Sequence, residues 1–77
     1  MKFFIIQCKG MSLYVQQNEK YPADYSYTNN IQNATWFASG LQAKEFAEGV
    51  MDDPYEIHVL DINIITWNAL QFLILQK

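Results

Sequence analysis

Arginine is missing from this 77-residue chain, and histidine and cysteine occur once each. Five lysines carry all the positive side-chain charge, and they are scattered along the sequence. Bidentate recognition of phosphates and of guanine edges relies on arginine, and binding along a nucleic-acid backbone needs a clustered basic stripe. We therefore expect no direct binding to nucleic acid.

The single cysteine, Cys8, cannot form an internal disulfide, which argues against a small secreted scaffold. The apolar run at residues 3–6 is too short for a membrane span or for the apolar region of a signal peptide. We therefore expect a cytoplasmic protein that does not bind membranes.

The chain also lacks the residue sets that catalysis and metal binding need. His58 is the only histidine, and no nucleophile accompanies it in the sequence. Zinc needs about four ligands, and the run Asp52, Asp53 and Glu56 lacks the alternating oxygen ligands and the glycine of a calcium loop. We expect no enzyme activity, no metal and no cofactor.

Apolar residues are plentiful, at 51 % of the chain, and 16 % of the residues are aromatic. This is enough to build a core for one domain, spanning residues 1–77. Strand-forming residues on both sides of the Lys9–Gly10 turn predict a β-hairpin at residues 2–8 and 12–17. Tyr25 and Tyr27 alternate with polar residues and predict a short strand at 25–28.

A helix is predicted at about residues 39–51. Ser39 is a favourable N-cap, and Gln42 three residues later completes a capping box. Gly49 and Pro54 bracket the end of the helix. Four apolar residues at helical spacing form the stripe that should face the core: Ala43, Phe46, Ala47 and Val50.

Two further strands are predicted, at residues 55–66 and at 72–75, although one or two helical turns are the alternative for the second. The apolar positions change parity near Val59 and Leu60, which predicts a bulge or a twist there. The expected fold is α+β: an antiparallel sheet of four or five strands with one main helix on one face, in the order β-β-(β)-α-β-β.

Acidic residues gather along and behind the predicted helix. A helical projection places Glu45, Glu48 and, if the helix extends that far, Asp52 along one outward edge, and the other two acids follow close behind. This ridge gives no evident structural gain, since like charges repel and acids oppose the dipole at a helix C-terminus. A net-negative surface that aids solubility is the alternative explanation. The ridge consists of Glu45, Glu48, Asp52, Asp53 and Glu56.

Consecutive apolar residues in the first and last strands place hydrophobic side chains on both faces of the sheet. One helix covers one face only, so the other face needs a second cover. A homodimer packed sheet to sheet is one solution. A small twisted sheet that folds its own C-terminal segment or the 18–33 loop across this face is the other.

The stretch NATWFASGLQAKEFAE, residues 33–48, resembles a layout of small phage and prophage proteins. In that layout a short A-T-x-F strand leads through a capped turn into an A-x-x-F-A helix. Size, acidity and the lack of a catalytic set also resemble phage anti-defence proteins, including anti-CRISPR inhibitors. The resemblance implies a protein that binds and inhibits another protein, and it transfers no functional residue.

The leading hypothesis is therefore an acidic inhibitor or modulator that occupies a basic, nucleic-acid-binding surface of a partner such as an effector complex. The acidic ridge would make the charged contacts. Tyr21, Tyr25 and Tyr27, with Leu41 as a further candidate, would supply the apolar anchors. The alternative is a structural or regulatory homodimer without an inhibitory role.

Overall fold

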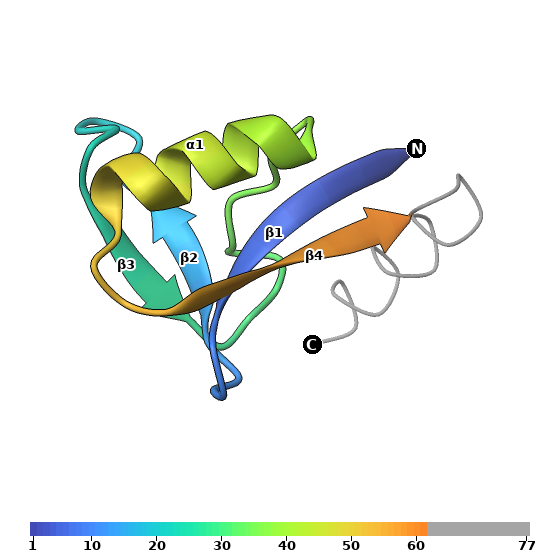
Figure 1. Cartoon of the computed structure of the whole chain (residues 1–77), viewed down its shortest axis with the longest axis horizontal. Helices are drawn as coiled ribbons and strands as arrows, with labels where there is room; N and C mark the ends of the chain where they lie inside the picture. The colour runs from blue at the N-terminus through green and yellow to red at the C-terminus, as the bar shows by residue number, and fades with distance from the viewer. Residues whose placement is uncertain (62–77) are drawn as a thin grey trace.

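The computed structural model describes residues 1–61 of the chain. Its elements are β1 (Lys2–Cys8), β2 (Tyr14–Gln17), β3 (Tyr25–Thr28), α1 (Gly40–Val50) and β4 (Tyr55–Asp61). The strands form an antiparallel sheet in the order β3-β2-β1-β4, and α1 lies across one face (Figure 1). The predicted α+β fold is confirmed, while residues 62–66 and the strand predicted at 72–75 lie outside the described residues.

The N-terminal hairpin forms, but its two strands diverge soon after the turn. Gly10 has a positive φ of 77°, a conformation that glycine adopts without steric cost. Gln7 and Tyr14 are the one Cα pair between β1 and β2. Beyond it, Phe37 exchanges backbone hydrogen bonds of 2.8 and 2.7 Å with Phe4, and Thr35 N–H donates to Val15 O. The chain that leads into α1 is thus wedged between β1 and β2.

The helix begins where the capping signal predicts. Ser39 is the N-cap, and its Oγ accepts a hydrogen bond of 3.1 Å from the Gln42 N–H. Met51 leaves the helix in an extended conformation while its N–H still donates to Ala47 O. The predicted bounds of 39–51 therefore agree with α1, because both ends are fixed by local contacts.

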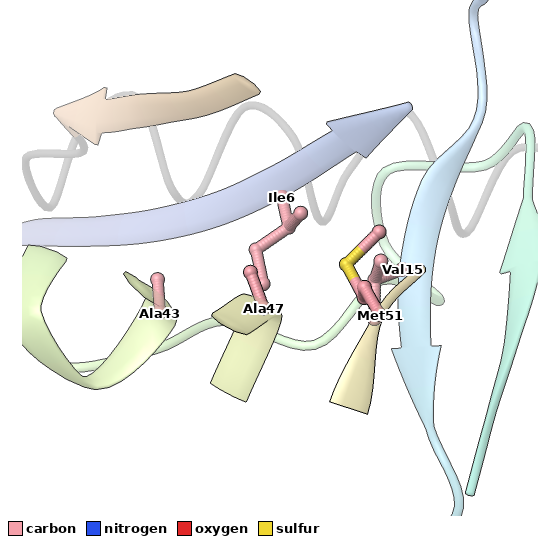
Figure 2. Close-up of a cluster of buried hydrophobic side chains, with 5 residues drawn as sticks. All are labelled: Ile6, Val15, Ala43, Ala47 and Met51. Carbon is pink, nitrogen blue, oxygen red and sulfur yellow. The ribbon is translucent and has the colours of Figure 1, made fainter. Parts of the chain in front are cut away.

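The core lies between α1 and the sheet. Ala43 and Ala47 are fully buried, and their small side chains let the helix axis approach β1 closely, where the Ile6 side chain lies over Ala47. Figure 2 shows this cluster, whose members are Ile6, Val15, Ala43, Ala47 and Met51. Seven half-buried side chains surround it: Phe4, Tyr25, Tyr27, Phe37, Phe46, Tyr55 and Ile57.

The pairing of β4 with β1 is unbroken from Lys2 opposite Asp61 to Cys8 opposite Tyr55. Of the two features predicted as alternatives near Val59–Leu60, a bulge or a twist, the bulge is therefore wrong. The apolar positions change parity along β4 because apolar side chains lie on both faces of the sheet. Ile57 packs against the core under α1, whereas Leu60 lies on the other face, opposite Phe3.

The face of the sheet away from α1 is also partly covered within the described residues. The Phe3 and Trp36 rings lie 5.4 Å apart, and Trp36 Nε1–H donates to Ile31 O. Ile5, on the same face, is only 2 % exposed. Trp36, in the chain between β3 and α1, therefore covers Phe3 on this face.

Candidate partner-binding surface

The outward face of α1 combines one exposed leucine with two carboxylates. A helix turns by about 100° per residue, so Leu41, Glu45 and Glu48 fall within roughly 60° of one another. We call these three residues the outer stripe. They lie on the side of α1 opposite the buried Ala43 and Ala47. All three are exposed, and Leu41 retains 65 % of its surface, which with Met1 is the largest value among the exposed large hydrophobic residues of the described part of the chain.

The negative charge near the end of α1 is only partly offset. Glu48 lies 3.9 Å from Lys44 in an ion pair whose side chains are both 59 % exposed, so water weakens the attraction. Within residues 1–61, no ion pair forms to Glu45, and the last turn of α1 holds no basic residue. Asp52 follows directly and is also exposed. These acids oppose the helix dipole, so this end of the molecule carries an unbalanced negative field.

Asp53 has a different role, because a tyrosine holds its carboxylate. The Tyr27 hydroxyl donates a hydrogen bond of 2.9 Å to Asp53 Oδ2. The Tyr27 ring lies edge-on to Tyr25 at 5.6 Å, and Tyr25 in turn meets Phe46 at 6.2 Å. Burial raises the pKa of the Tyr27 phenol well above its usual range, and the bond to Asp53 adds to this. Tyr25 and Tyr27 therefore first of all support the edge of the core.

Tyr21 remains open to solvent, with 56 % of its surface exposed. It lies in the loop between β2 and β3, where Asn18 Oδ1 accepts hydrogen bonds from the Lys20 and Tyr21 N–H groups. The Lys20 ammonium lies 5.5 Å from the centre of the Tyr21 ring. Of the three tyrosines predicted to contact a partner, Tyr21 is thus the exposed one.

Glu56 lies apart from the acids of the helix. It is paired with Gln7 across β1 and β4, one residue away from the Ile6–Ile57 pair that faces the core. Because side chains alternate along a strand, Glu56 points to the face away from α1. The structure brings Asp53 and Tyr27 together but does not place Glu56 with Glu45 and Glu48.

A polar groove of about 870 Å³ lies beside the loop between β2 and β3. Amide and hydroxyl side chains make up much of its lining, and its charged members, Glu19, Lys20 and Asp24, are of mixed sign. Within residues 1–61 no three His, Cys, Asp or Glu side chains are grouped to hold a metal ion. His58 is exposed in β4, while the buried Cys8 lies 3.9 Å from the Met11 sulfur.

No helix in the described part of the chain is long and apolar enough to cross a membrane.

The sequence does not predict the Tyr27–Asp53 hydrogen bond. Its two residues are 26 positions apart, and no local pattern connects a strand tyrosine to an aspartate beyond the helix. The acidic cluster itself is visible in the sequence, because Glu45 and Glu48 follow the helical period that also aligns Leu41 with them.

No known protein family matches the sequence, and searches of curated proteins and of solved structures found no similar protein.

Proposed function

We propose that this protein is a small acidic inhibitor or modulator that binds another protein through the outer stripe of α1. The observation that carries the proposal is the alignment of the exposed Leu41 with Glu45 and Glu48, opposite the buried face of the same helix. An exposed leucine next to aligned carboxylates suits a partner surface that is basic and has an apolar hollow. Asp52 extends the negative surface beyond the helix end.

The rigidity of α1 supports this proposal. The helix is capped by Ser39 and held by two fully buried alanines, so the backbone positions of the outer stripe are fixed. A fixed backbone leaves less entropy to be lost on binding, and the carboxylates can lie where phosphates would lie on a basic surface. Long-range attraction between opposite charges would also speed the encounter.

The unbalanced negative charge near the end of α1 also supports the proposal. A helix selected for stability alone would carry lysines in its last turn, where α1 has none. Acids kept at such a position contribute nothing evident to folding, so a function at the surface is a physical reason for them. Solubility is the competing reason for these acids. Acidic residues anywhere on the surface would aid solubility, so this explanation gives the outer stripe no special role.

We further propose that the partner is a nucleic-acid-binding effector of a bacterial defence system, and that the protein is a phage anti-defence protein of the anti-CRISPR type. The layout of residues 33–48, the small size and the net charge of −3 support this assignment. An acidic protein that covers a basic groove would exclude nucleic acid from it by competition.

A plaque assay tests both parts of the proposal. Bacteria whose CRISPR–Cas systems of different types target an infecting phage would express the wild-type protein, and plaques should reappear with at least one type. The double variant Glu45→Lys, Glu48→Lys should fail at equal soluble expression. The control Glu19→Lys, Asp24→Lys has the same change of charge in the loop between β2 and β3, and it should retain activity.

The outcomes separate the two parts. If no system is inhibited, the anti-defence assignment is wrong. If the protein inhibits and the Glu45→Lys, Glu48→Lys variant inhibits equally well, the outer stripe is not the contact surface. Loss in the loop variant alone would move the contact to the surface around Tyr21.

A further inference from the structure

β4 is an edge strand with a long outer edge. It is the last strand in the sheet order, and all seven of its residues pair with β1 on the inner side. Within residues 1–61, no strand pairs with its outer side. The edge therefore offers a row of backbone donors and acceptors to any strand that could lie beside it.

The hydrogen bonds of β1 show which groups of β4 face outward. Phe4 directs both its N–H and its C=O toward Phe37, on the side away from β4. Backbone groups alternate along a strand, so Phe3, Ile5 and Gln7 direct theirs toward β4. The Lys9 N–H, which donates to Pro54 O, continues this alternation.

The partners of these residues in β4 follow from the register. Leu60, His58 and Glu56 lie opposite Phe3, Ile5 and Gln7, so their backbone groups face β1. The N–H and C=O groups of Ile57 and Val59 therefore face outward. Their side chains lie on the α1 side of the sheet, and Val59 is 54 % exposed there.

Within residues 1–61, three features that often block strand addition are missing from this edge. β4 contains no proline and no lysine, and its pairing with β1 runs without a bulge. Its charged groups are Glu56 on the face away from α1 and Asp61 at its end, and both are acidic. A second copy would bring the same acids into the new interface, whereas a basic strand would complement them.

We propose that the outer edge of β4 binds an extended basic segment of a partner protein as an added antiparallel strand. Apolar side chains of that segment would lie beside Ile57 and Val59 on the α1 side. Its lysine or arginine side chains would lie beside Glu56 on the opposite side. The ligand class is thus a peptide in which apolar and basic residues alternate, bound chiefly through its backbone. This site does not depend on the outer stripe of α1, with which it shares no residue.

The probe is a seven-residue peptide with blocked ends in which lysine alternates with valine. In antiparallel pairing, residues that share hydrogen bonds also share a face, so the valine backbone groups would bond to Ile57 and Val59. A peptide with N-methyl groups on its valines would lose those bonds. The matched control has N-methyl groups on its lysines, whose N–H groups would face away from β4.

On the protein side, Val59→Pro removes an outward N–H, a change that an edge strand tolerates because that N–H makes no bond to β1. Val59→Thr keeps the N–H and the branched shape. Fluorescence anisotropy would give the affinities, and amide hydrogen exchange with NMR detection would locate the peptide. If Val59→Pro does not fold, the comparison of the two methylated peptides still tests whether the peptide binds through backbone hydrogen bonds to β4.

We expect slower exchange of the Ile57 and Val59 amides when the peptide is added. Binding should weaken at least tenfold for the valine-methylated peptide and for Val59→Pro, but by less than threefold for the lysine-methylated peptide and for Val59→Thr. Glu56→Gln should weaken binding about twofold to fivefold, as for one exposed charge pair.

Three results would overturn the proposal. Equal binding of both methylated peptides would mean that the peptide does not add as an antiparallel strand. Protection of Ile57 and Val59 in the dilute free protein would mean that another part of the chain occupies the edge. Protection that grows with protein concentration alone would assign the edge to a second copy.

Discussion

Tyr27 shows how one side chain can belong both to the core and to an acidic surface. Its ring packs beside Tyr25, while its hydroxyl reaches Asp53 just beyond α1. The bond connects β3 to the loop between α1 and β4, which is also held by the buried Met51 and by the hydrogen bond from the Lys9 N–H to Pro54 O. Asp53 therefore serves the fold first, and of the acids in α1 and directly after it, Glu45, Glu48 and Asp52 remain as candidates for a partner contact.

Tyr27 predicts a loss of stability at alkaline pH. The pKa of the folded phenol is raised by burial and by Asp53, whereas an unfolded tyrosine ionises at about pH 10. Above that pH the unfolded chain binds fewer protons than the folded one, so the free energy of unfolding falls as pH rises. The contribution of Tyr27 is complete below pH ~10 and is lost above it.

Urea titrations at intervals from pH 8 to about pH 11 would measure this effect in the wild type and in Tyr27→Phe. The variant should be less stable at pH 8 by about 1 kcal/mol, since it lacks the hydrogen bond. Its stability should then fall less steeply with pH. Parallel slopes for the two proteins would contradict the role given to Tyr27.

Substitution of glycine by alanine should have opposite effects on stability at Gly10 and at Gly49. A Cβ at Gly10 or at Gly49 would meet no atom within 4 Å, so packing does not enter the comparison. Gly49→Ala in α1 should raise the free energy of unfolding by about 0.5–1 kcal/mol, because alanine has less freedom to lose. Gly10→Ala should lower it by about 1–2 kcal/mol, because Gly10 has a positive φ. Thermal unfolding of both variants checks this, and an equal sign for the two would show that one of the two backbone conformations is misassigned.

At the scale of elements, the two faces of α1 have different roles, because one packs against the core and the other is exposed. One face buries Ala43 and Ala47 and places Phe46 against Phe37, with ring centres 5.6 Å apart. The other face carries the outer stripe. Substitutions on the two faces should therefore separate stability from binding.

Phe46→Ala should lower the free energy of unfolding by about 2–3 kcal/mol, below the roughly 3–5 kcal/mol of a fully buried aromatic, because Phe46 is only half-buried. Leu41→Ala on the outer face is the matched control and should change it by less than about 0.5 kcal/mol. Denaturant titrations give both values. The reverse order would mean that α1 packs through its other side.

The sequence was sufficient for elements set by local signals. The Ser39 cap, the stripe through Ala43 and Ala47 and the Lys9–Gly10 turn act within a few residues, and α1 and the first hairpin formed as predicted. The insertion of Phe37 between β1 and β2 depends on contacts across the whole domain, and no local pattern encodes it. The supposed bulge near Val59 failed for the same reason. A strand with apolar residues on both faces and a strand with a bulge show the same change of apolar parity in the sequence, so the sequence cannot distinguish them.

Whether the outer stripe binds a partner also could not follow from sequence. The helical period aligns Glu45 and Glu48, and the structure adds that they are exposed and that Lys44 offsets only one of them. Glu56 was grouped with them because it is close in sequence. The alternation of β4 places it on another face, where it belongs to the proposed strand-binding edge.

At the scale of the whole molecule, residues 1–61 partly cover the sheet face that a sheet-to-sheet homodimer would bury. Phe3 packs against Trp36, and Ile5 is 2 % exposed on the face away from α1. Among residues 1–61, the exposed large hydrophobic residues are scattered over several elements, and they are Met1, Met11, Tyr21, Leu41 and Val59. Sedimentation should therefore show a monomer at micromolar concentrations, and a stable dimer would favour the homodimeric alternative.

The central claim is that the acids of α1 are kept for a basic partner. The most direct measurement is the rate of association with a partner captured from a bacterial lysate, for the wild type and for Glu45→Lys, Glu48→Lys, at low and high salt. We predict that charge reversal slows association at least about tenfold, and that added salt slows the wild type similarly, because exposed charges are screened beyond about 8–10 Å. The thermal stability of the variant should stay level or rise by a few tenths of a kcal/mol, about the size of the repulsion that is relieved. An association rate that is unchanged by both the substitutions and the salt would contradict the claim.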